Sequence, residues 1–176
     1  MVVEAARLAA RSRVASASSI RVARVSFYDW MLALHLVAVF AVSSALVLYS
    51  VLVVSGRRMA TLEQTRTLFR VAPVGGPLIG AGMGLALAFG IVLALKSSEF
   101  EIWNGWIVAG FVLWALLAEI GRRTGVYYTD VQKLAESGNE PEVLARLRAP
   151  KGALLQVATV ALFVLLLLDM LFKPGA

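Results

Sequence analysis

Four long apolar stretches dominate the sequence and limit the folds that it can adopt. They cover about residues 30–54, 73–95, 102–120 and 153–172. Each is close to the roughly 20 residues of helix that a bilayer core requires. They are apolar all round rather than on one stripe, as expected of helices that face lipid and one another. A membrane barrel would require short segments of alternating polarity, and the sequence contains none. The sequence therefore predicts an all-α, polytopic membrane protein with a four-transmembrane-helix bundle.

The composition excludes several classes of chemistry. Of the 176 residues, 60% are hydrophobic and 16% are charged, whereas a soluble chain is about 45–50% apolar and about 25% charged. The chain contains no cysteine, which excludes disulfides, thiolate metal sites and cysteine nucleophiles. A single histidine, His35, cannot by itself form a two-histidine metal site or ligate haem from both sides.

The sequence divides into a basic extension, residues 1–26, and a membrane domain, residues 27–176. The extension is rich in Ala, Arg, Ser and Val, and Glu4 is its only acidic residue. We expect it to be disordered or to lie at the membrane interface. A targeting segment and a start codon placed too far upstream remain open alternatives.

Positive charges predict which way the chain crosses the membrane, because cytoplasmic loops usually hold the excess. The second loop contains only Lys96, so we expect the more basic first and third loops in the cytoplasm and both termini on the periplasmic side. The arginines of residues 1–26 favour the opposite orientation. The basic residues of the first and third loops are Arg57, Arg58, Arg66, Arg70, Arg122, Arg123, Lys133, Arg146, Arg148 and Lys151. The net charge of +6 is therefore explained by topology and lipid head groups, and we expect no nucleic-acid partner.

The third loop, residues 122–151, is long enough to contain structure of its own. Residues 126–136 are predicted to extend the third span as a helix, and the Ser-Gly-Asn sequence at 137–139 is predicted to end it. Residues 141–147 are predicted to form another short helix. The mixed charges of this loop indicate a solvated cap, with docking of a partner as the alternative.

Two patterns of spacing predict how the spans pack. Small residues recur every fourth position in the second span, and such a face lets two membrane helices approach closely. Its members are Gly76, Gly80, Gly84 and Ala88. We expect this face to be a packing surface, with a flexible gating helix as the alternative. In the first span, His35, Val42 and Tyr49 share a stripe with a spacing of seven residues. If that stripe is the packed face, His35 is predicted to face another helix rather than lipid.

Three ionisable side chains lie within the spans, where such groups are costly and are therefore candidates for function. Glu119 precedes Arg122 and Arg123 by three and four residues, so we expect an ion pair at the membrane interface. The other two are His35 and Asp169.

His35 and Asp169 are predicted to lie at a similar depth, within roughly 5–8 Å of the outer boundary at 1.5 Å per residue. Asn104 begins the third span on the same side. These three residues form a possible outer polar site, which predicts that His35 and Asp169 lie within about 4 Å of each other, the reach of an ion pair. The alternatives are a structural hydrogen bond with Asp169 paired to Lys173, a weak ion or metal site that uses His35, and a proton- or ligand-responsive site.

Three short motifs resemble a family of predicted bacterial integral membrane proteins of unknown function, itself distantly similar to the copper-resistance D-type membrane domain. They are FYDWMLALHLVA at residues 27–38, APVGGPL at 72–78 and NGWI at 104–107. The resemblance covers Phe27 to Phe172 and implies four spans in a bacterial inner membrane, with no established activity. The lack of cysteine, of a second histidine and of methionine clusters departs from a copper site, and residues 1–26 depart from the family pattern.

No catalytic constellation is visible in the sequence, such as a phosphate-binding loop, a His-Glu-x-x-His motif or a nucleophile elbow. We therefore expect a non-enzymatic accessory or structural subunit of a membrane assembly, embedded in the lipid bilayer and associated with other membrane subunits or with a second copy of itself. No cofactor is predicted. The alternatives are a transporter or channel component with an outward-facing polar site, and a redox accessory that binds haem or copper.

Overall fold

The computed structural model describes residues 26–70, 72–96 and 103–174. These residues form six helices and no strand. The helices are α2 (Phe27–Gly56), α3 (Leu62–Phe69), α4 (Ala72–Lys96), α5 (Gly105–Ser137), α6 (Glu140–Arg148) and α7 (Pro150–Phe172). Four of them, α2, α4, α5 and α7, provide segments that are long and apolar enough to cross a membrane. The predicted all-α bundle is therefore confirmed for the described part of the chain.

The helix ends follow from local sequence. Ser26 caps α2 in a capping box: its hydroxyl accepts from the backbone N–H of Asp29 at 3.1 Å, and the Asp29 carboxylate accepts from the backbone N–H of Ser26 at 2.8 Å. The helix α5 ends at Gly138, whose φ of 86° is accessible to glycine without a Cβ penalty. Asn139 then caps α6 by accepting from the backbone N–H of Glu142.

The third loop is more helical than a simple connection. The helix α5 continues to Ser137, as predicted for residues 126–136, and α6 corresponds to the short helix predicted at 141–147. The helix α3 is an addition that the apolar pattern does not predict, because it is only eight residues long and mixed in polarity. Residues 1–25 lie outside the described part of the chain, so the extension stays a prediction.

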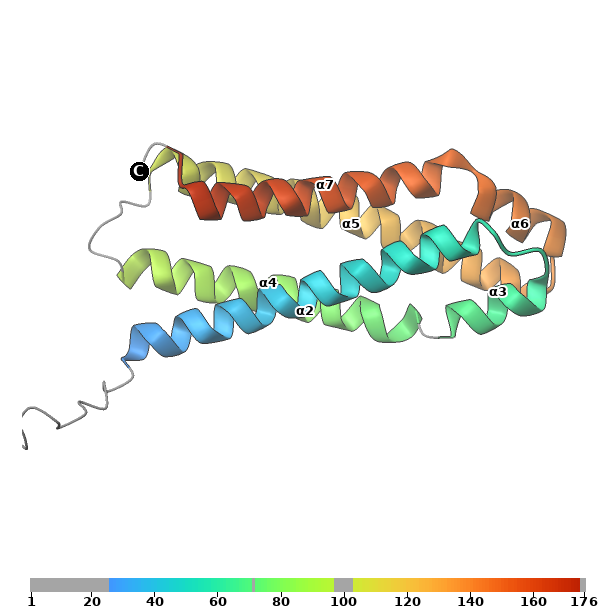
Figure 1. Ribbon diagram of the computed structural model, residues 1–176, viewed down its shortest axis with the longest axis horizontal. Helices are drawn as coiled ribbons and strands as arrows, with labels where there is room; N and C mark the ends of the chain where they lie inside the picture. Colours follow the sequence, from blue (N-terminus) through green and yellow to red (C-terminus); the bar gives the residue numbers. More distant parts are fainter. Residues whose placement is uncertain (1–25, 71, 97–102, 175–176) are drawn as a thin grey trace, which may run out of the picture.

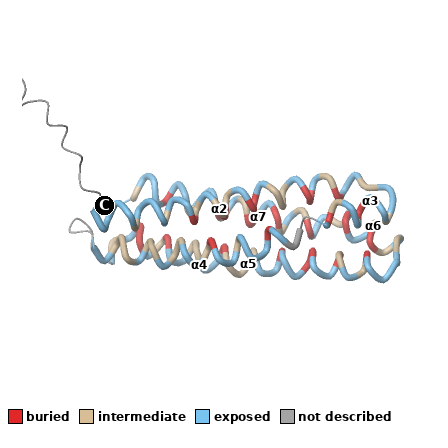
Figure 2. Tube along the Cα trace, turned by 90° about the horizontal axis from the view of Figure 1, so that it is seen from below, coloured by how far each residue is buried: buried red, intermediate tan, exposed pale blue. Residues whose placement is uncertain are grey.

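The four long helices form a two-by-two bundle. The helices α2 and α4 cross as one antiparallel pair, and α5 and α7 lie side by side as a second pair (Figure 1). In the perpendicular view, α2 overlaps α7 in one row and α4 overlaps α5 in the other, with buried residues between the rows (Figure 2). Contacts join α2 to α7, and a hydrogen bond joins α5 to α4. Both ends of the described chain lie at the end of the bundle opposite to α3 and α6 (Figure 1).

We call the end of the bundle that carries α3 and α6 the capped end. It has a hydrophobic core of its own. Tyr127 donates from its hydroxyl to the Arg146 carbonyl at 2.7 Å, and the Arg66 side chain donates to the Ala135 carbonyl at 2.9 Å. The buried members of this core are Leu52, Val53, Phe69, Tyr127, Tyr128, Val131, Ala135, Val143 and Leu147. A second buried cluster lies among the spans and contains Val42, Leu46, Leu117 and Phe163.

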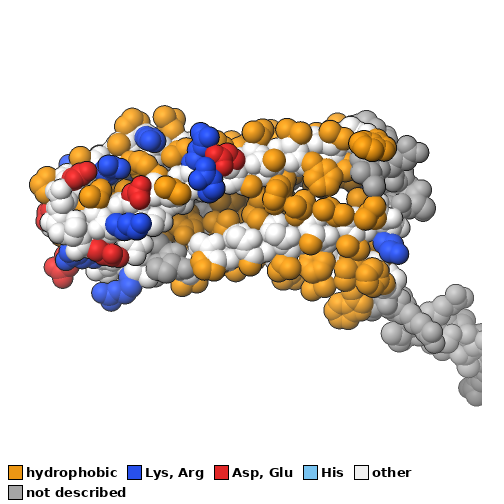
Figure 3. Space-filling model, turned by 180° about the vertical axis from the view of Figure 1, so that it is seen from behind, with side chains coloured by type: hydrophobic (Ala, Val, Ile, Leu, Met, Phe, Trp, Pro, Cys, Tyr) orange, Lys and Arg blue, Asp and Glu red, His pale blue; other side chains and the backbone are white. Residues whose placement is uncertain are grey.

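The surface is divided between these two regions. Lys, Arg, Asp and Glu side chains gather at the capped end, whereas hydrophobic side chains cover most of the rest of the visible face (Figure 3). Among the exposed apolar residues, Val37, Phe40 and Leu154 are 66%, 77% and 66% exposed. Such a broad apolar surface is unusual for a monomer in water.

Candidate functional site

His35 contacts α4, as its heptad stripe predicts. Its Nδ1 lies 2.8 Å from the carbonyl oxygen of Ala86. Because a carbonyl only accepts, this geometry places a proton on Nδ1, which donates to the Ala86 oxygen. His35 is therefore held by the backbone of a neighbouring helix.

The whole stripe of α2 packs against glycines of α4. A Cβ built on Gly90 would lie 3.3 Å from the His35 ring, and one on Gly82 would lie 2.7 Å from Val42 Cγ2. A Cβ on Gly75 would lie 2.6 Å from Tyr49. Residues later in α2 contact glycines earlier in α4, as an antiparallel pair of helices requires.

Most of the small-residue face predicted for packing lies away from α2, and only a Cβ on Gly76 would approach it, 3.7 Å from the Tyr49 hydroxyl. Gly76, Gly80, Gly84 and Ala88 are exposed, and a Cβ on Gly80 or Gly84 would meet nothing within 4 Å. The prediction is therefore corrected for contacts within this chain. Gly75, Gly82 and Gly90 fill the seam instead, on a different face of α4. The sequence contains both sets of glycines, and only the position of α2 distinguishes them.

Asp169 is buried against α5. Its side chain is 9% exposed, and its Oδ2 would lie 3.2 Å from a Cβ on Gly110. That oxygen has no hydrogen-bond partner among the described residues. The next turn places the Lys173 ammonium over the Trp106 ring, 5.6 Å from its centroid, and Asp169 and Lys173 form no ion pair.

The structure does not join the three residues of the predicted outer site into one polar cluster. His35 lies in the α2–α4 pair and Asp169 in the α5–α7 pair, and no hydrogen bond or ion pair joins them. Asn104 precedes the first residue of α5, and its side chain makes no capping hydrogen bond. The described residues contain no group of three or more His, Cys, Asp or Glu side chains that could hold a metal ion.

Glu119 forms the predicted pair with both arginines. Its carboxylate lies 2.8 Å from Arg122 Nε and 2.7 Å from Arg123 Nε. All three side chains are well exposed on α5. Because each contact is made within one helix, this ion pair has a local role in α5 and joins no second element.

Several polar contacts between the long helices were not predicted from the sequence. The Trp114 indole donates to the Met83 carbonyl at 3.4 Å and joins α5 to α4. Gln156 Nε2 donates to Ser50 Oγ at 3.0 Å and to the Leu46 carbonyl at 3.5 Å, and the hydroxyls of Thr124 and Thr159 lie 3.1 Å apart. The polarity of Gln156 within an apolar block was the only signal of these contacts.

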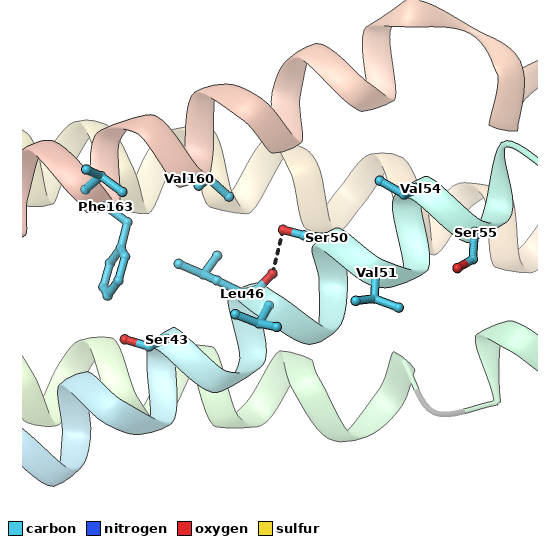
Figure 4. Close-up of a pocket in the computed structure, with 10 residues that line it drawn as sticks. Ser43, Leu46, Ser50, Val51, Val54, Ser55, Val160 and Phe163 are labelled. Carbon is cyan, nitrogen blue, oxygen red and sulfur yellow. Dashed lines mark hydrogen bonds between the residues drawn. The ribbon is translucent and has the colours of Figure 1, made fainter.

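An apolar groove of about 520 Å³ lies between α2 and α7 (Figure 4). Phe163 projects from α7 toward α2 (Figure 4). The hydroxyls of Ser43 and Ser50 donate to carbonyls of their own helix, at 2.9 and 2.8 Å, so they add little polarity to the groove. His35, Asp169 and Asn104 do not line it. The lining residues are Ser43, Leu46, Val47, Ser50, Val51, Val54, Ser55, Val160, Phe163 and Val164.

Comparisons with known proteins do not place this chain in a family. No family model, no curated protein and no solved structure matches it.

Proposed function

We propose that this chain is a multi-pass membrane protein that acts as an accessory or structural subunit of a membrane assembly. The proposed partner is a second copy of the same chain. Other membrane subunits are the alternative partners. The observation that carries the proposal is the exposed small-residue face of α4.

Insertion into a bilayer is supported by the length and the surface of the helices. Four helices with apolar segments of at least 18 residues surround few polar contacts, and their outward side chains are largely apolar. Contact of this apolar surface with water is unfavourable, whereas its contact with hydrocarbon is not. The capped end carries most of the charge, so we place it in the cytoplasm of a bacterial inner membrane and both termini on the periplasmic side.

The small-residue face of α4 is the part of the bundle that is best suited to a further helix. In the 18-residue apolar stretch of Leu62–Lys96, which contains α4, 6% of the residues are buried, against 33% in the corresponding stretch of α2. The helix α4 is therefore the least covered of the four long helices. Gly80 and Gly84 are exposed along this face with open space beyond them. Helix association in membranes depends on close backbone approach, which such small residues permit.

Replacing the two central glycines tests the proposal. Gly80→Leu combined with Gly84→Leu should raise the dissociation constant of the dimer in detergent or lipid about tenfold or more, because bulky side chains separate the backbones. Equilibrium sedimentation or energy transfer between labelled copies measures this constant. Ala161→Leu is the matched control, because Ala161 is an exposed small residue on α7. Unchanged association in the double variant, or an equal loss in the control, would contradict the proposal.

A further inference from the structure

Beyond the Ser55 end of the groove, where α2 ends and α7 begins, two cations have no carboxylate partner in the described part of the chain. Arg57 follows α2 two residues after Ser55, which lines the groove. Its Nη1 donates to the Ala149 carbonyl at 3.2 Å, at the beginning of α7. Lys151 lies in the first turn of α7, with its ammonium 5.9 Å from the centroid of the Tyr127 ring. Neither cation is in an ion pair within the described chain.

Both cations are exposed and retain donors for a ligand. A guanidinium has five N–H donors and Arg57 uses one of them on Ala149. The arginines of the α5 ion pair differ, because Glu119 already neutralises part of their charge. Uncompensated positive charge is therefore concentrated where α2 ends and α7 begins.

The groove is apolar, and its length is close to the thickness of one leaflet of a bilayer. Leu46 and Phe163 are buried, whereas Val47, Val51 and Val54 are 65%, 56% and 55% exposed. From Ser43 to Ser55 the groove follows α2 for roughly 18 Å at 1.5 Å per residue. One leaflet of a hydrocarbon core about 30 Å thick measures about 15 Å.

The geometry points to an anionic glycerophospholipid as the occupant, with one acyl chain in the α2–α7 groove and its phosphate between Arg57 and Lys151. The positive charges of Arg57 and Lys151 favour an anionic head group. The length of the groove matches an acyl chain within a single leaflet. Valine side chains dominate the exposed walls, whereas helix–helix interfaces in membranes favour Gly, Ala and Ser. The proposal needs a bilayer but does not depend on self-association through α4.

Native mass spectrometry of the full chain, released from detergent with added lipids, tests this inference. Phosphatidylglycerol and phosphatidylcholine with identical acyl chains are compared, because they share the hydrocarbon and differ in net charge. We expect phosphatidylglycerol to be retained preferentially. Arg57→Gln and Lys151→Gln should each weaken its binding about fivefold, the equivalent of about 1 kcal/mol per cation. Arg70→Gln is the matched control, since it removes one exposed charge after α3, on the way to α4.

A second variant tests the groove separately from the charge. Val51→Trp fills the groove at an exposed position and should lower the binding of both lipids, while circular dichroism shows that the helices are retained. Equal binding of the two lipids by the unmodified protein would overturn the inference, as would an equal loss in Arg70→Gln or no loss in Val51→Trp. Full displacement of the lipid by glycerol phosphate would also overturn it, because the ligand would then be the free anion.

Discussion

Gly82→Ala should destabilise the bundle by about 1–3 kcal/mol, the usual cost of overpacking a closed contact. The new Cβ would lie 2.7 Å from Val42 Cγ2 and 3.2 Å from the Ala38 carbonyl oxygen. Val42 is 2% exposed and its branched side chain is stiff in a helix, and the carbonyl belongs to the backbone of α2. The helices α2 and α4 must therefore separate. Reversible unfolding in mixed detergent, followed by circular dichroism, measures the loss.

Gly80→Ala provides the matched control on the same helix. A Cβ at Gly80 meets nothing within 4 Å, so this substitution should be neutral or should stabilise the helix by up to about 1 kcal/mol. The two variants differ only in which face of α4 carries the added methyl group. Equal stability of both variants would mean that α2 does not pack on the Gly82 face.

Asp169→Leu should stabilise the bundle by about 1–3 kcal/mol. Leucine keeps the branching of aspartate at Cγ, and it removes a carboxylate oxygen that is buried beside Gly110 without a hydrogen-bond partner among the described residues. An uncompensated buried polar atom carries its full desolvation cost, whereas an apolar group at this position carries none. The same unfolding measurement reports the gain.

Asp130→Leu is the control for this prediction, because it removes an exposed carboxylate from α5. Its effect should remain within about 0.5 kcal/mol. A loss of stability in Asp169→Leu would contradict a purely structural reading of Asp169 and would indicate that the carboxylate binds a cation or proton that the fold requires. That outcome would favour the transporter or channel alternative.

The sequence was sufficient to predict the four long apolar helices and, given that the His35 stripe is packed, the contact of His35 with a neighbouring helix. Both follow from the spacing of apolar residues along single helices, which is a local property. The eight-residue helix α3 was not predictable in this way, because its stability depends on packing against α5. Local signals are strong for long apolar helices and weak for short polar ones.

The choice between the two glycine faces of α4 also lay beyond the sequence. Gly76, Gly80 and Gly84 have the more regular spacing, yet Gly75 and Gly82 contact α2. Spacing identifies a face but does not identify its partner, which depends on the rotation of α4 about its axis. For the same reason, a similar depth for His35 and Asp169 did not predict their separate partners on α4 and α5.

Cysteine cross-linking in the native membrane tests the proposed self-association most directly. The chain contains no cysteine, so a single substitution supplies the only thiol. A two-fold axis along the membrane normal would bring the same residue of both copies together. Disulfides require Cα atoms within about 7 Å, so Gly84→Cys should form a cross-linked dimer under mild oxidation. Leu154→Cys, at a position on α7 that is 66% exposed, should remain monomeric. A monomeric Gly84→Cys protein, or equal cross-linking at both positions, would contradict a dimer built on the small-residue face of α4.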